Sequence, residues 1–249
     1  MNVEQLEGRN VVIEALRRGR RKVRQIMIDQ RAKTDRKLDE IVRLAKNKNI
    51  KVSYVDRNTL DKMAVGGVHN GVIAKAAPLP QMTTQQLLDD IFDRGEYPFI
   101  ILADEIQYEQ NLGAIMRSAL GAGVHGVIVP HRRGASISPV VNRVSMGGAE
   151  AVPLIREGLS SALKQIKKAG IPVVGADMGG KPMWDTPLKG ALALILGGES
   201  KGLSPTLKNK CRHIVSVPLQ GDLESLNVSV TAGILMFEKC RQDRISGEY

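Results

Sequence analysis

Three polar stretches of this 249-residue sequence carry residues that could take part in chemistry. One of them, SLNVSVTAGILMFE, places Ser225, Asn227 and Ser229 at alternate positions before an apolar helical pattern. A helix start needs only one side-chain cap, so either Ser225 or Asn227 suffices for that purpose. The other residue then needs a different explanation, and we take both as candidate site residues.

A second stretch, QNLGAIMRSALGAG, is typical of a helix that follows a strand and a polar loop. Asn111 is expected to be the N-cap of this helix. Arg117 projects beside the apolar stripe, and helical side chains lean toward the N-terminus, so its guanidinium could reach back toward Asn111. A forked cation near a helix start suits a phosphate group.

A third stretch, ALALILGGESKGLSP, leads from a buried strand into a glycine-rich loop with one acid, Glu199. Gly197, Gly198 and Gly202 would let the backbone approach a ligand closely, but they would also suit any tight turn. This stretch alone does not decide between the two interpretations.

Several other site classes are not predicted. The glycines of GAGVHG, residues 121–126, close a helix and open a strand, whereas a dinucleotide site needs a strand, a turn and then a helix. Gly121 and Gly123 are better explained as residues at a helix end. The sequence has no phosphate-binding G-x-x-x-x-G-K-[ST] loop. Cys211 and Cys240 lie far apart and the four histidines are scattered, so we expect reduced thiols and no metal site.

Short apolar runs and helical patterns must position these loops. Prolines and a polar tract near residues 76–85 indicate a linker, and we predict domains at 1–77 and 98–249 with a linker over 78–97. The first domain is predicted to be a small α/β module. The second is predicted to be an α/β domain with a parallel sheet flanked by helices, because helical patterns separate the apolar runs FIILAD, HGVIVP, AVPLIRE, IPVVGAD, ALALILG and HIVSVP. Binding sites in such sheets lie at the carboxyl ends of the strands.

Positive charge is concentrated in the first domain. Residues 1–75 hold 18 Lys and Arg against 9 Asp and Glu, a net charge of +9, and the remainder holds 18 against 17, a net charge of +1. This favours binding of a polyanion such as RNA, although a solvated basic face would have the same composition. Tyr54 is the only aromatic residue in this segment, which favours phosphate contacts over base stacking. We expect a cytoplasmic protein that does not bind membranes, since no apolar run could cross a bilayer and the first residues do not resemble a signal peptide.

The three polar stretches, NLGAIMRSA, LGGESKGL and VPLQGDLESLNVSV, together resemble the motifs of the SpoU branch of the SPOUT class of RNA methyltransferases, also called the TrmH family. The first domain resembles the SpoU-type substrate-binding domain, which is similar to small ribosomal RNA-binding proteins and ends in a segment like GGVHNGVIAKA. The resemblance implies an S-adenosylmethionine-dependent RNA 2'-O-ribose methyltransferase. It also implies a homodimer and a trefoil knot near the carboxyl end of the catalytic domain.

The resemblance assigns two sets of site residues. It implies that the catalytic set is Asn111, Arg117, Glu199, Ser225 and Asn227. It implies that the residues around the cofactor are Gly197, Gly198, Val217, Leu219 and Leu226. The sequence departs from the family pattern at Tyr108-Glu109 and at Ser200, where many members carry Asp-Pro and Gly.

The substrate is expected to be ribosomal RNA. The two-domain layout is similar to that of family members that methylate a guanosine ribose in 23S ribosomal RNA. Methylation of transfer RNA, or of an adenosine ribose as in antibiotic-resistance enzymes, remains an alternative. A non-catalytic, ribosome-associated RNA-binding protein is another, and the basic first domain alone would support it.

Overall fold

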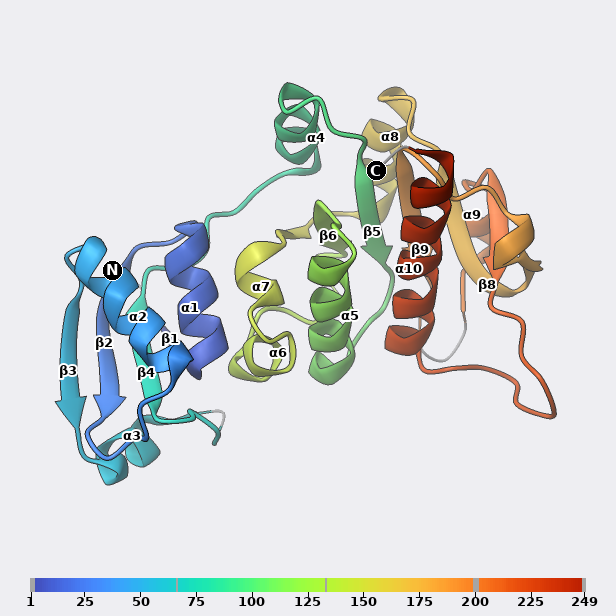
Figure 1. Cartoon of the computed structure of the whole chain (residues 1–249). Coiled ribbons are helices and arrows are strands. Elements are labelled where there is room, and N and C mark those ends of the chain that lie inside the picture. The colour runs from blue at the N-terminus through green and yellow to red at the C-terminus, as the bar shows by residue number, and fades with distance from the viewer. Residues whose placement is uncertain (1–2, 66, 133, 199–201, 248–249) are drawn as a thin grey trace. The chain divides into compact units, whose positions relative to one another are not determined.

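A computed structural model describes residues 3–65, 67–132, 134–198 and 202–247 of the chain. The chain divides into two compact units (Figure 1). One consists of Met1–Gln81 and Ile137–Ala151, and the other of Met82–Ser136 and Val152–Tyr249. The segment 137–151 thus packs with the first unit although it lies within the range predicted for the second domain. The domain boundaries at 77 and 98 stay a prediction.

The first unit is built on a mixed sheet, which has four strands in the described part of the chain, in the order β1-β4-β2-β3. Strands β2 and β3 are parallel, and β4 runs antiparallel to both β1 and β2. Its elements are β1 (Glu4–Glu7), α1 (Arg9–Arg18), β2 (Val23–Asp29), α2 (Arg36–Asn47), β3 (Lys51–Val55), α3 (Arg57–Met63), β4 (Val72–Ala76), α6 (Pro139–Val144) and α7 (Gly148–Ala151).

Helices α1 and α2 cover this sheet because each presents an apolar stripe to it. Val12 and Leu16 of α1 and Ile41 of α2 are buried with Ile26 and Ala74 of the sheet in one core. A smaller cluster of Met27, Leu60 and Ile73 holds α3. The predicted α/β module is therefore present, but β1 and the short helices α3, α6 and α7 were not expected from the sequence.

A buried ion pair connects α7 to the rest of the first unit. The guanidinium of Arg21 donates to both carboxylate oxygens of Glu150 at 2.9 and 2.5 Å, and both side chains are almost fully buried. Arg21 also donates to Glu4 at 2.6 Å and to the carbonyl of Ala77 at 3.3 Å. Because an unpaired buried charge is strongly destabilising, this network holds the segment 137–151 in the unit.

The second unit confirms the predicted parallel sheet. In the part of this unit that the structure describes, six parallel strands follow the order β10-β8-β9-β5-β6-β7. Five of the apolar runs each contain one strand, and IPVVGAD contains the first half of β8, which continues to Pro182. The elements are α4 (Thr84–Asp93), β5 (Phe99–Ala103), α5 (Glu109–Gly121), β6 (Gly126–Val129), β7 (Leu154–Arg156), α8 (Leu159–Lys168), β8 (Val173–Pro182), η1 (Met183–Asp185), β9 (Leu192–Leu196), α9 (Pro205–Lys208), β10 (His213–Ser216) and α10 (Val228–Ser246).

Helices cover both faces of this sheet. Helices α5 and α10 lie side by side on one face (Figure 1). Apolar residues of α4 and α8 pack on the other face against Ile100, Leu102 and Ile195. Helix α4 lies within the predicted linker, yet its Leu87, Leu88 and Ile91 are buried in this core. Among the described residues, no helix has both the length and the apolar composition to span a membrane.

Candidate functional site

A cavity of about 850 Å³ lies in the second unit at the carboxyl ends of its central strands. Its wall combines the middle of β8, the ends of β9 and β10 with the loops that follow them, and the first turns of α5 and α10. The described lining residues are Tyr108, Gln110, Asn111, Ala176, Asp177, Met178, Leu196, Gly197, Gly198, Gly202, Lys208, Val215, Ser216, Val217, Leu219, Glu224, Ser225, Leu226, Asn227, Val228 and Thr231. All three polar stretches of the sequence therefore contribute to one cavity, as expected for an open parallel sheet.

A direct hydrogen bond joins the first stretch to the last. The carboxamide nitrogen of Asn227 donates to Oδ1 of Asn111 at 3.0 Å, across 116 positions of sequence. Oδ1 of Asn227 accepts from the backbone nitrogen and the hydroxyl of Ser229 at 2.8 and 2.6 Å. Asn227 is thus the N-cap of α10 and also the connection to α5.

This arrangement decides between the two cap candidates of the last helix. Asn227 is the cap, and Ser225 lines the cavity two positions before it. The prediction that Asn111 caps α5 is wrong, because the helix begins at Glu109 and its N-cap is Tyr108. Asn111 lies in the first turn instead, where its carboxamide meets Asn227.

The loop after β9 is closed tightly on itself. Gly198 and Gly202 exchange two backbone hydrogen bonds, each of 3.1 Å. A Cβ on Gly197 would lie 2.4 Å from the carbonyl carbon of Gly202 and 2.6 Å from the nitrogen of Leu203, so only glycine fits there. The predicted catalytic residue Glu199, and the departure at Ser200, lie outside the described residues.

Asp177, at the end of the buried part of β8, was missed by the sequence analysis. Its carboxylate accepts from the backbone nitrogens of Leu203 at 3.2 Å and Gly179 at 3.4 Å, and it pairs with the ammonium of Lys208 at 2.9 Å. Burial alone would raise the pKa of Asp177, but these donors outweigh it and lower the pKa. Asp177 therefore anchors the loop after β9. An acid at the carboxyl end of the run IPVVGAD was the available signal.

Arg117 is not part of the cavity lining. Its side chain is exposed two turns along α5, and among the described residues it forms no hydrogen bond or ion pair. An exposed guanidinium without a described partner remains available to an external anion.

The cavity suits a nucleoside with a short charged tail. Its volume lies in the range of small-molecule sites, and its lining combines apolar side chains with Gly197, Gly198 and Gly202. The predicted cofactor residues Gly197, Gly198, Val217, Leu219 and Leu226 all line it. The charged residues in the described lining are Asp177, Lys208 and Glu224, which could meet the ammonium and carboxylate of an amino-acid group. Within the described ranges, no cluster of three or more His, Cys, Asp or Glu side chains could hold a metal ion.

Comparison with known families identifies both parts of the chain. Residues 98–237 match the family model of the SpoU rRNA Methylase family. Residues 5–82 match the model described as RNA 2'-O ribose methyltransferase substrate binding.

Similar proteins match over nearly the whole chain. The TrmH-family protein YacO of Bacillus subtilis is 35% identical over 97% of this chain and 96% of its own length. The 23S rRNA (guanosine-2'-O-)-methyltransferase RlmB of Escherichia coli is 32% identical over 96% of this chain and 98% of its own. The crystal structure of the SpoU methyltransferase AviRb from Streptomyces viridochromogenes in complex with AdoMet has a TM-score of 0.78 and 25% identity, covering 98% of this chain and 91% of AviRb.

Proposed function

Because this chain belongs to the SpoU rRNA methylase family of RNA 2'-O-methyltransferases, we propose that its substrate is a guanosine ribose of 23S ribosomal RNA. The observation that carries the proposal is the single cavity built from all three motif stretches, with Asn111 and Asn227 in contact. The relatives that act on 23S rRNA support the choice of substrate.

S-adenosylmethionine supplies an activated methyl group, so the protein mainly has to position the acceptor and manage one proton. We assign Gly197, Gly198, Val217, Leu219 and Leu226 to the cofactor. Their backbone can bind adenine and ribose edges without a charged side chain. The role of Asp177 is to hold the glycine loop in place.

Asn111, Ser225 and Asn227 are proposed to orient the ribose hydroxyl. Asn111 and Asn227 already hold each other, which fixes their carboxamides at the cavity wall. Arg117 is proposed to bind a substrate phosphate, because a guanidinium stays protonated far above neutral pH and is a poor base. Glu199 is proposed to orient Arg117 or a polar group of the substrate.

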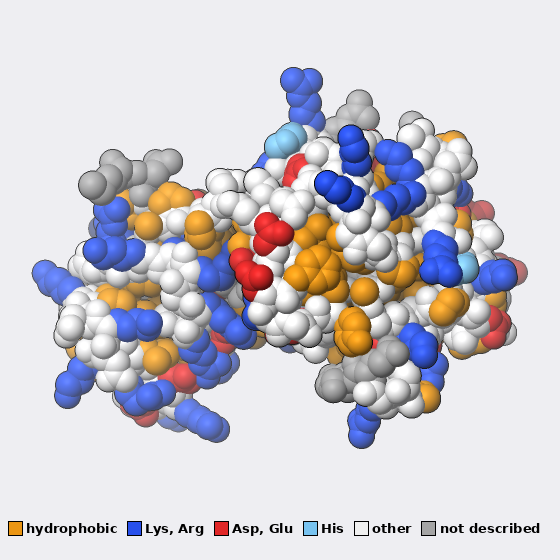
Figure 2. Space-filling view, turned by 90° about the horizontal axis from the view of Figure 1, so that it is seen from above, with side chains coloured by type: hydrophobic (Ala, Val, Ile, Leu, Met, Phe, Trp, Pro, Cys, Tyr) orange, Lys and Arg blue, Asp and Glu red, His pale blue; other side chains and the backbone are white. Residues whose placement is uncertain are grey.

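The proposed homodimer and knot rest on the same unit. Val230, Phe237 and Ile245 of α10 are exposed although the opposite side of the helix is buried, and a second copy of the chain would cover them. Hydrophobic side chains also reach the surface of this unit in Figure 2. The proposed trefoil knot would involve the loops after β9 and β10, which both border the cavity. Sedimentation of the purified protein tests the dimer, and a crystal structure with cofactor tests the knot.

Transfer of labelled methyl groups from S-adenosylmethionine to 23S rRNA, followed by mapping of the modified ribose, tests the function. We expect Arg117→Ala to lower turnover at least about 100-fold at saturating RNA and cofactor. Arg212 is an exposed arginine directly before β10, and Arg212→Ala is the matched control. Unchanged turnover in Arg117→Ala would exclude the phosphate role. If only transfer RNA is methylated, transfer RNA is the substrate and not 23S rRNA. Failure to bind S-adenosylmethionine would favour a non-catalytic RNA-binding protein.

A further inference from the structure

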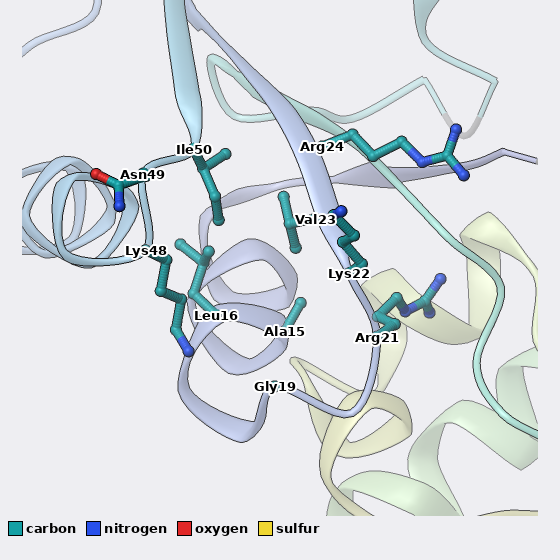
Figure 3. A pocket seen from close by; sticks show the side chains of 10 residues that line it. All are labelled: Ala15, Leu16, Gly19, Arg21, Lys22, Val23, Arg24, Lys48, Asn49 and Ile50. Atoms are coloured by element: carbon teal, nitrogen blue, oxygen red, sulfur yellow. The ribbon is translucent and has the colours of Figure 1, made fainter.

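Two hollows lie at opposite ends of the helices of the first unit. One, here called the basic cleft, has a volume of about 470 Å³ and lies where α1 and α2 begin and β2 ends. The other, here called the apolar hollow, has a volume of about 650 Å³ and lies where α1 and α2 end and β2 begins (Figure 3). The contrast between them indicates where a polyanion binds.

The basic cleft is lined mainly by cations. Its described charged residues are the five cations Arg9, Arg31, Lys33, Lys37 and Arg57 and the two carboxylates Asp29 and Asp35. The side chains of Arg31, Lys33 and Lys37 are exposed and form no ion pair with any described residue. Lys and Arg side chains are spread over the face of this unit in Figure 2, with few acids between them.

Both carboxylates of the cleft are engaged within the protein. Asp29 is buried and accepts from the backbone nitrogen of Arg31 at 2.9 Å. Asp35 caps α2 by accepting from Lys37 and Leu38, and it also pairs with Arg9 at 2.5 Å. These carboxylates therefore shape the cleft while the exposed cations face solvent.

The cleft has a defined wall. Arg9 donates to the carbonyl of Asn70 at 3.0 Å, which connects α1 to the turn before β4. In that turn Gly71 has a φ of 76°, and a Cβ there would lie 3.4 Å from Ala32 and 3.5 Å from Asp29. The loop after β2 and the turn before β4 are thus in close contact, so the positions of the cations are built into the fold.

The apolar hollow also carries cations, but it differs from the basic cleft in its apolar floor and in the helix ends that border it. Ala15, Leu16 and Val23 are buried in its floor (Figure 3). The exposed cations Lys22, Arg24 and Lys48 surround this floor. Arg21 also lines it, but its guanidinium is committed to Glu150 and Glu4. The carboxyl ends of α1 and α2 carry partial negative charge, whereas their amino ends add partial positive charge to the basic cleft.

We propose that the basic cleft binds backbone phosphates of the RNA substrate and that the apolar hollow does not. This inference rests on the proposed function and names the surface that the substrate uses. The described lining holds no aromatic side chain, so binding depends on charge and backbone shape rather than on base stacking. The cleft contributes affinity, and the cavity of the second unit performs the chemistry.

Two charge-matched double variants of the full-length protein test the proposal. Arg31→Gln with Lys33→Gln removes two exposed cations from the basic cleft, and Lys22→Gln with Lys48→Gln removes two from the apolar hollow. The affinity of each for a 23S rRNA fragment is measured by fluorescence anisotropy between 50 and 200 mM salt. We expect the cleft variant to lose about tenfold in affinity and the slope of log affinity against log salt to become shallower by about 2. The hollow variant should stay within about twofold of the wild type.

Equal losses in the two variants, or a loss in the hollow variant alone, would overturn the proposal. S-adenosylmethionine titration and turnover at saturating RNA separate this result from the proposed function. If the wild type methylates RNA and the cleft variant binds RNA normally, the proposal for the cleft is refuted and the proposed function stands. If the wild type binds RNA through the cleft but transfers no methyl group, the proposed methyltransferase function is refuted and the proposal for the cleft stands.

Discussion

The cavity of the second unit and the basic cleft of the first are built on opposite principles. The cavity joins residues from Tyr108 to Thr231, and its wall depends on backbone contacts such as that of Gly197 with Gly202. The cleft joins residues from Arg9 to Gly71 and is dominated by charge. The cavity should therefore be sensitive to displacements below an ångström and indifferent to salt. The cleft should tolerate shape changes and respond strongly to salt.

The largest effect is expected where backbone meets backbone. In Gly197→Ala, the new Cβ would collide with Gly202 and Leu203, so the loop after β9 must move. We expect S-adenosylmethionine affinity, measured by calorimetry, to fall about 100-fold, because a displacement of about 1 Å in an active site can have an effect of this size. Gly158→Ala is the matched control, since a Cβ there meets nothing within 4 Å. Normal affinity in Gly197→Ala would show that the loop is not a rigid wall.

A smaller effect is expected from the bond between the two asparagines. Asn227→Asp keeps a helix cap but replaces the donor to Asn111 with a second acceptor. Turnover should fall about tenfold, which corresponds to the roughly 1.4 kcal/mol of one hydrogen bond. Asn227→Ala should lose the same turnover and also about 1 kcal/mol of stability from the missing cap, measured by urea unfolding. Full activity in Asn227→Asp would mean that the bond is structural only.

The anchor of the glycine loop predicts a pH dependence of stability. The pKa of Asp177 is lowered in the folded protein, so its stabilising contribution is present above the ordinary pKa of 3.8 and is lost as pH falls through the lowered value. Urea unfolding of Asp177→Asn should show a deficit of about 1.5 kcal/mol at neutral pH that shrinks below the ordinary pKa. Asp222→Asn, in the exposed loop before α10, should show no such deficit. A deficit that persists in acid would contradict the role of the charge.

The smallest effect is expected in the cleft itself. Replacing Arg31 and Lys33 by glutamine removes exposed charges without touching the core, so the melting temperature should change by less than about 2 °C. The same variant is expected to lose RNA affinity. A thermal melt measured together with the binding curve therefore separates a loss of binding from a loss of stability. A large drop in melting temperature would mean that these cations hold the loop after β2.

Much of the fold could be read from local patterns. Each buried strand of the second unit is an apolar run between turn residues, and the helices α5 and α8 follow their apolar stripes. Helix α4 was assigned to the linker although Thr83 and Gln86 form a capping box and Leu87, Leu88 and Ile91 share one face. That signal was available in the sequence.

The residues of the candidate site were likewise predicted only in part from the sequence. Sequence motifs selected the five cofactor residues, and all of them line the cavity, but their roles stay predictions. Asp177 escaped notice because its partners Leu203 and Lys208 lie in another loop. The cap of α5 was placed at Asn111 because local preference favours asparagine there, whereas the long-range bond to Asn227 uses that side chain differently.

By itself, the sequence determined the alternation of strands and helices, the concentration of positive charge in residues 1–75 and the identity of the motif loops. Only the tertiary structure decided that these loops share one cavity, that Asn111 meets Asn227 and that residues 137–151 join the first unit. The physical reason is the range of the interactions. Periodicity and capping act within a few residues, whereas the wall of this cavity also needs contacts between distant groups, such as Asn111 and Asn227, 116 positions apart, which no local pattern encodes.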